Sequence, residues 1–129
     1  MRVGLLEDDI ATQEMFLLIL QDEGYVAINY SSADECLAAL GVTVPLTMPL
    51  PVDMMIIDWR LDDTMTGIEV IQRLRSTPHL NTLPLILSTA ATLSHAQMQE
   101  LSNLNVAILE KPFSVDEITR LIQRLVTRS

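Results

Sequence analysis

The chain has 129 residues, of which 49% are hydrophobic and 19% charged, and its formal net charge is −9. This profile is typical of one globular domain spanning residues 1–129 and excludes a disordered chain. The acidic excess argues against direct binding to nucleic acid or to an anionic membrane, because both carry negative charge. The single cysteine, Cys36, excludes an internal disulfide, fits a reducing compartment and is expected to be a small buried hydrophobe.

Neither a secretory signal nor a membrane span is predicted. The opening MRVGLL runs directly into EDD, which leaves no apolar core for a signal peptide. The apolar stretch over 42–57 is interrupted by three prolines and by Asp53, so it does not qualify as a transmembrane helix. We therefore expect a cytoplasmic domain.

The first half of the chain alternates apolar runs with helical patterns. An apolar run over 3–6 precedes a helical pattern over 10–23. A weaker strand is predicted over 26–30. The S-A-D-E motif at 32–35 then predicts a capping box and a helix that Gly41 can end.

The second half continues the alternation, with strand cores predicted over 54–57, 85–87 and 106–109. Capping boxes at 66–69 and 114–117 predict two helices, and a third helix is predicted over 94–104. The strands are continuously apolar rather than alternating, which favours a parallel sheet covered on both faces. The sequence therefore predicts five βα units.

The segment GVTVPLTMPLPV, over 41–52, is the irregular part of the chain. Its prolines at 45, 49 and 51 exclude a helix interior and a central strand. We expect a long connection that lies across apolar surface.

Polar residues follow the predicted strands at their carboxyl ends, where the ligand sites of open parallel sheets lie. These strand ends read Glu7-Asp8-Asp9, Asp58, Ser88-Thr89-Ala90 and Glu110-Lys111-Pro112. Clustered carboxylates stay ionised beside a divalent cation, and a site of oxygen ligands fits Mg²⁺ better than zinc. Such a site can hold a phosphoryl group through the metal, Lys111 and the Thr89 hydroxyl. We expect Asp58 to be exposed at its strand end as a nucleophile that forms an aspartyl-phosphate.

Each of these residues also has a simpler interpretation. Asp8 and Asp9 favour the amino end of the first helix. Thr89 is typical of a turn or capping hydroxyl, Lys111 of a solvated charge, and Asp58 can act as a cap. Their joint placement at four strand ends favours a common site.

The whole chain resembles a response-regulator receiver domain, the phospho-accepting module of two-component signalling, through LLEDD, DMMIIDWR, LSTA and LEKPF. The resemblance implies a single doubly wound α/β domain of the (βα)5, flavodoxin-like type, with a five-stranded parallel sheet in the order 2-1-3-4-5. It implies a signalling domain rather than an enzyme, phosphorylated with Mg²⁺ by a histidine kinase or a histidine phosphotransfer protein. Its output would be a downstream effector or an attached domain, reached through the surface of helix 4, strand 5 and helix 5.

Carried onto this sequence, the resemblance makes Asp58 the phosphoacceptor. It places Mg²⁺ on Glu7, Asp8, Asp58 and the main-chain carbonyl of Arg60. Thr89 and Lys111 would contact the phosphoryl group, and the Lys111–Pro112 bond would be cis. Asp9 would be a helix-start acid.

The chain departs from the family pattern at two places near the site. Ile108 stands where the family often has an aromatic residue, so output must use other parts of the helix 4, strand 5 and helix 5 face. Asp62 stands where many relatives have proline, and Gly67 lies nine residues after Asp58 rather than eight. The extra acids of this loop can alter metal affinity or access for a phosphodonor.

The sequence also bears on three other functions. Ile108 keeps open a receiver-like interaction module that is not phosphorylated. A phosphohydrolase with an aspartate nucleophile is disfavoured, because Arg60 stands where such enzymes carry a second acid. A nucleotide- or flavin-binding protein is disfavoured because the four glycines are isolated. His79 and His95 are expected to be surface residues, and Trp59 to be partly exposed.

Overall fold

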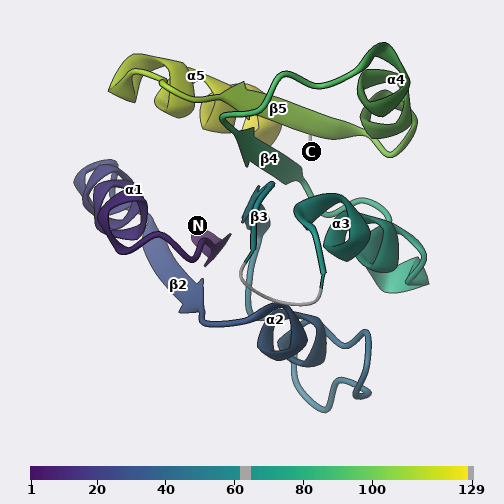
Figure 1. The fold of residues 1–129 in the computed structure, drawn as a ribbon. Coiled ribbons are helices and arrows are strands. Elements are labelled where there is room, and N and C mark those ends of the chain that lie inside the picture. The colour runs from purple at the N-terminus through teal and green to yellow at the C-terminus, as the bar shows by residue number, and fades with distance from the viewer. Residues whose placement is uncertain (62–64, 128–129) are drawn as a thin grey trace.

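The protein is described by a computed structural model that covers residues 1–61 and 65–127. Five parallel strands form one sheet in the order β2-β1-β3-β4-β5, with helices on both faces (Figure 1). The predicted doubly wound (βα)5 fold and its strand order are therefore confirmed. None of the described helices is long and apolar enough to cross a membrane.

The predicted strands and helices are all present, with ends that differ by one or two residues. In chain order the elements are β1 (Arg2–Leu6), α1 (Ile10–Asp22), β2 (Val26–Tyr30), α2 (Ala33–Ala39), β3 (Met54–Asp58), α3 (Gly67–Arg75), β4 (Leu85–Thr89), α4 (His95–Asn103), β5 (Val106–Glu110) and α5 (Val115–Thr127). A short 3-10 helix, η1 (Pro78–Leu80), was not predicted. Pro78 fixes the backbone angle of its first residue, which suits a helical turn.

The sheet separates two apolar cores. Side chains from α1 and α5 cover one face, with Phe16 and Ile118 fully buried there. Side chains from α2, α3 and α4 cover the other face, where Cys36 and Leu74 are fully buried. Burial raises the pKa of the Cys36 thiol to about 12. The prediction that Cys36 is a small buried hydrophobe is confirmed.

Side-chain caps fix where the helices begin. Both hydrogen bonds of the predicted capping box form at Thr66 before α3. At α2 the box is only half formed: the Glu35 N–H donates to Ser32 Oγ over 3.0 Å, whereas the Glu35 carboxylate accepts from the Ser31 N–H over 3.1 Å. An additional box, not predicted, forms at Ser94 before α4.

The segment over 41–52 lies at the amino-terminal end of β3 and projects from the fold between α2 and β3 (Figure 1). Val42 and Leu50 pack against the core, and Val52 is buried. The middle of the segment is exposed, with Met48 76% and Val44 54% accessible. The prediction that it lies across apolar surface is therefore right for its ends and wrong for its middle.

Arg75, the last residue of α3, joins three segments through their backbone. Its guanidinium donates to the carbonyl oxygens of Leu80 at 2.7 Å, Leu104 at 2.7 Å and Asn105 at 3.2 Å. Leu104 is the carboxyl cap of α4, where carbonyl groups lack helical partners. One half-buried side chain thus connects α3, η1 and the turn between α4 and β5.

Candidate functional site

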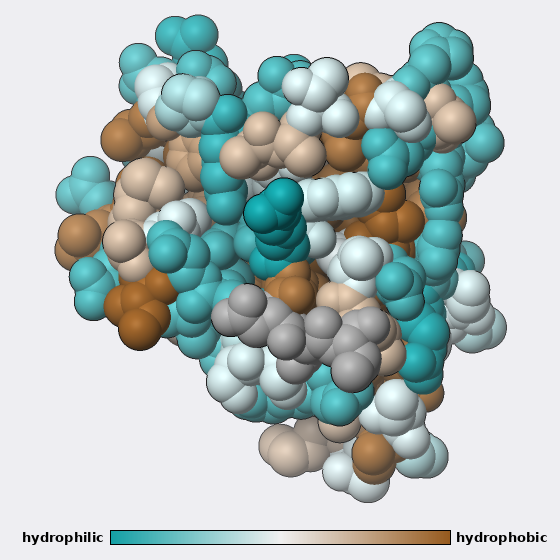
Figure 2. Space-filling model, viewed as in Figure 1, coloured by the Kyte–Doolittle hydropathy of each residue, from teal (hydrophilic) through white to brown (hydrophobic). Residues whose placement is uncertain are grey.

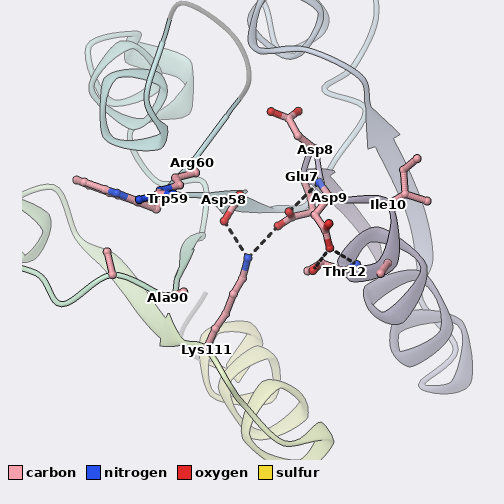
Figure 3. Close-up of a pocket in the computed structure, with 12 residues that line it drawn as sticks. Glu7, Asp8, Asp9, Ile10, Thr12, Asp58, Trp59, Arg60, Ala90 and Lys111 are labelled. Atoms are coloured by element: carbon pink, nitrogen blue, oxygen red, sulfur yellow. Dashed lines mark hydrogen bonds and ion pairs between the residues drawn. The ribbon is translucent and has the colours of Figure 1, made fainter.

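Three charged side chains meet at the carboxyl end of the sheet. The Lys111 ammonium lies 3.0 Å from Asp58 Oδ1 and 3.5 Å from Glu7 Oε2 (Figure 3). Asp58 is the last residue of β3, while Glu7 and Lys111 directly follow β1 and β5. The predicted convergence of these three residues is therefore present in the fold.

The two carboxylates of this cluster are buried. Glu7 is 1% exposed and Asp58 7%, so the expectation that Asp58 is exposed at its strand end is wrong. Asp58 belongs to a strand that is buried along its whole length, which explains its low accessibility. A buried carboxylate needs a counter-charge or hydrogen bonds, and the Lys111 ammonium supplies both.

Glu7 is protonated more readily at this site than an ordinary glutamate. Its burial, reinforced by the negative charge of Asp58, raises the pKa of Glu7 to about 7. The Lys111 charge and the Asp9 N–H, which donates to Glu7 Oε1 over 3.2 Å, only partly oppose this effect. A cation at the site would favour the ionised form of Glu7.

The two acids that follow Glu7 have different positions. Asp9 caps α1: its carboxylate accepts from the Thr12 N–H at 2.9 Å and from the Thr12 hydroxyl at 2.6 Å. The prediction that Asp9 is a helix-start acid is confirmed. Asp8 lines the same pocket, but its carboxylate points away from Glu7 and Asp58 (Figure 3).

The expected metal ligands are near one another without forming a closed cage. Within residues 1–61 and 65–127, no three His, Cys, Asp or Glu side chains group closely enough to hold a metal ion. The groups available at the pocket are nevertheless oxygen donors, as Mg²⁺ prefers. They come from Glu7, Asp8, Asp58 and the backbone of Arg60, all of which line the pocket. Asp62 and its neighbour Asp63, the extra acids of the loop, lie outside the described residues.

The residues at the end of β4 are arranged for a turn. Thr89 is buried, and its hydroxyl accepts from the Ala91 N–H over 3.0 Å. This contact is the turn or capping role, the simpler of its two interpretations. The Lys111–Pro112 peptide bond is cis, as predicted. Ile108 is half-buried and packs against the α2–α4 core.

The site opens to solvent through a hollow of about 740 Å³. Hydrophilic side chains lie at the centre of this face of the molecule (Figure 2). Trp59 and the exposed Arg60 line the hollow beside Asp58, and Trp59 is half-buried as predicted. The carboxylate of Asp58 can therefore be approached by a small anionic group, although the residue itself is mostly covered.

Gly67 contributes to the site in a way that the sequence did not indicate. A Cβ at this position would overlap the backbone carbonyl of Asp58. The Gly67 N–H also donates to the Trp59 carbonyl over 3.0 Å. The first residue of α3 is thus packed directly against the backbone of Asp58, and only glycine fits there without displacing it.

Comparison with known proteins identifies the family. A family model described as the response regulator receiver domain matches residues 3–123. This chain belongs to the response regulator receiver family. The receiver is 31% identical over its whole length to the cell cycle transcriptional regulator CtrA of Caulobacter vibrioides, of which it covers 52%. It is 27% identical over 99% of its length to the phosphate regulon transcriptional regulatory protein PhoB of Rhizobium meliloti, of which it covers 53%.

Solved structures agree with this assignment. The chemotaxis protein CheY4 of Vibrio cholerae is 26% identical and superposes with a TM-score of 0.78, covering 96% of this receiver and 97% of that chain. The receiver spans about half the length of the two transcriptional regulators that it matches. Membership of the family makes it a signalling domain, in agreement with the prediction that it is not an enzyme.

Proposed function

We propose that this receiver accepts a phosphoryl group on Asp58 from a histidine kinase or a histidine phosphotransfer protein. The observation that supports this most directly is the Lys111 ammonium, held 3.0 Å from Asp58 and 3.5 Å from Glu7 at the floor of an open pocket. An ammonium in that place compensates the charge of an incoming phosphoryl group. Asp58 is the carboxylate that both contacts Lys111 and ends a central strand.

The transfer uses the Asp58 carboxylate as the nucleophile. One of its oxygens forms a bond to phosphorus while the bond from phosphorus to the donor atom breaks, and the electron pair leaves with the donor. Lys111 then moves from a carboxylate partner to phosphoryl oxygens. Hydrolysis reverses the change: water adds to phosphorus, and the electron pair returns to the Asp58 carboxylate.

Mg²⁺ fits the donor set and belongs to this proposal. Glu7, Asp8, Asp58 and the carbonyl of Arg60 would hold it. Bound there, Mg²⁺ would neutralise part of the charge that the phosphoryl group brings to two buried carboxylates. The raised pKa of Glu7 supports this assignment: burial and the charge of Asp58 outweigh the charge of Lys111, and a bound cation would oppose both effects.

Phosphorylation would be transmitted to the next protein or domain through a change in partner binding. Thr89 would exchange its hydrogen bond to the Ala91 N–H for one to the phosphoryl group. This exchange would shift the conformational equilibrium of the surface formed by α4, β5 and α5. Ile108 offers no hydroxyl for that change. We propose that the recipient is a downstream effector or an attached output domain in the cytoplasm. The net charge of −9 disfavours direct nucleic-acid contact by this domain.

Intact mass spectrometry after incubation with Mg²⁺ and acetyl phosphate tests the proposal. We expect a gain of one phosphoryl group that is absent with EDTA and absent in Asp58→Asn. Mg²⁺ titration of Trp59 fluorescence, in the same samples, reports metal binding independently of transfer. If neither acetyl phosphate nor a panel of histidine kinases labels Asp58, the domain is an interaction module that does not use phosphorylation.

A further inference from the structure

Ser88 presents an unusual buried hydroxyl beside the site. The residue is completely inaccessible, and its Oγ is the one buried side-chain polar atom of the described chain that has no hydrogen-bond partner. A buried hydroxyl without a partner lowers stability, and such groups are rare in native proteins. Alanine at this position would remove that cost, so the hydroxyl needs an explanation.

The placement of Ser88 connects it to the phosphoacceptor. Ser88 on β4 is the register partner of Asp58 on β3. Side chains alternate between the faces of a strand, and Ile56 and Ile86, two residues earlier, both belong to the α1 and α5 core. The side chains of Asp58 and Ser88 therefore stand next to each other on the same face of the sheet.

The same arrangement places Ser88 under the lysine. In the sheet, β4 separates β3 from β5, yet Lys111 after β5 reaches Asp58 at 3.0 Å. Its side chain must therefore cross the end of β4, where Ser88 lies. Nothing in this crossing requires a hydroxyl at residue 88.

We propose that Ser88 is a positioning residue for the phosphorylated form of Asp58, an inference that rests on the proposed function. In the unphosphorylated form, Asp58 Oδ1 accepts from Lys111. When the ammonium turns to the phosphoryl oxygens, the Asp58 oxygen that carries no phosphorus becomes a neutral carbonyl. It would keep Mg²⁺ on one lone pair and lose the hydrogen-bond donor on the other. The Ser88 hydroxyl, one strand away on the same face, then donates to this carbonyl. Ser88 keeps its proton throughout, and no covalent bond to it forms.

This hydrogen bond would exist in one state only. It would lower the free energy of the phosphorylated form relative to the unphosphorylated form, in which the hydroxyl is unpaired. Ser88→Ala should therefore have opposite effects on the two states. The unphosphorylated fold should resist urea better, and an acyl-phosphate analogue should bind more weakly.

Beryllofluoride, which bonds to a carboxylate oxygen as a phosphoryl group does, gives an equilibrium test. Its affinity is measured through Trp59 fluorescence in the presence of Mg²⁺ for wild type, Ser88→Ala and Ser88→Thr. We expect about three- to tenfold weaker binding for Ser88→Ala, as for the loss of one neutral hydrogen bond. Ser88→Thr, which keeps the hydroxyl, should restore most of the affinity.

Ile86→Val is the matched packing control, because it lies on the same strand and face two residues before Ser88 and is also fully buried. It should lower the urea midpoint without changing the affinity. Ser88→Ala with wild-type affinity, or with a lower urea midpoint than wild type, would overturn the inference. Absence of both beryllofluoride binding and phosphorylation in wild type would instead refute the proposed function, and the inference with it.

Discussion

Replacing Glu7 with glutamine should make the metal-free receiver more stable at alkaline pH. Glu7 is almost fully buried, and its pKa is raised from an ordinary value of 4.5 to about 7, first by burial and second by the charge of Asp58. The folded protein therefore binds a proton at Glu7 more tightly than the unfolded chain does. Glutamine keeps the shape of the side chain and removes the charge.

The sign and size of the effect follow from this difference in pKa. Below pH 4.5 Glu7 is protonated in both states and ionisation costs nothing. As pH rises from 4.5 through about 7, the unfolded chain releases its proton first, so the free energy of unfolding falls. The full difference corresponds to about 3 kcal/mol. Glu7→Gln should thus match wild type near pH 4, exceed it by about 1 kcal/mol at pH 5, and exceed it by about 3 kcal/mol at pH 8.

Urea unfolding, followed by Trp59 fluorescence in EDTA at several values between pH 5 and 8, measures this difference. The gap between mutant and wild type should widen as pH rises. Adding Mg²⁺ at pH 8 should then stabilise wild type more than Glu7→Gln, because the ionised carboxylate is a better ligand. A gap that is the same at pH 5 and pH 8 would refute the reasoning, since it would mean that Glu7 titrates alike in both states.

Other variants test the remaining contacts. Lys111→Met should destabilise the metal-free protein by about 3–5 kcal/mol at pH 8 in urea unfolding, because it leaves two buried carboxylates without a counter-charge; a cost below 1 kcal/mol would contradict this. Gly67→Ala should lower stability by about 1–3 kcal/mol and slow labelling by acetyl phosphate, through its clash with the Asp58 backbone. Equal labelling rates would show that the backbone accommodates the methyl group. Arg75→Lys should cost about 1–3 kcal/mol and speed hydrogen exchange in the turn between α4 and β5, whereas Arg73→Lys, on the exposed side of α3, should do neither.

The sequence predicted the fold and the main contacts of the site for a clear physical reason. Continuously apolar strands require cover on both faces, and parallel strands bring their carboxyl ends to one edge. Glu7, Asp58 and Lys111 had to converge once those two conditions held. Their order along the sheet then followed from the resemblance to receiver domains.

Other features depended on side-chain geometry that no pattern in the sequence specifies. The direction of the Asp8 carboxylate is one such feature. Another is the capping contact before α2, where the Glu35 carboxylate accepts from the N–H of Ser31 instead of the N–H of Ser32. The close approach of α3 to the β3 backbone depends on Gly67, because a Cβ there would overlap the Asp58 carbonyl. Ser88 looked like an ordinary polar residue beside Thr89 until the register showed it next to Asp58.

The projecting segment over 41–52 also offers a handle for surface attachment. It enters β3 at the end opposite Asp58, roughly 13–17 Å away along the five-residue strand. Met48 is 76% exposed, whereas the native thiol of Cys36 is fully buried with a pKa of about 12. Met48→Cys would therefore create a single reactive thiol. A receiver tethered through it to a sensor chip would present the pocket around Asp58 to the solution, so candidate kinases and effectors could be screened on the immobilised domain.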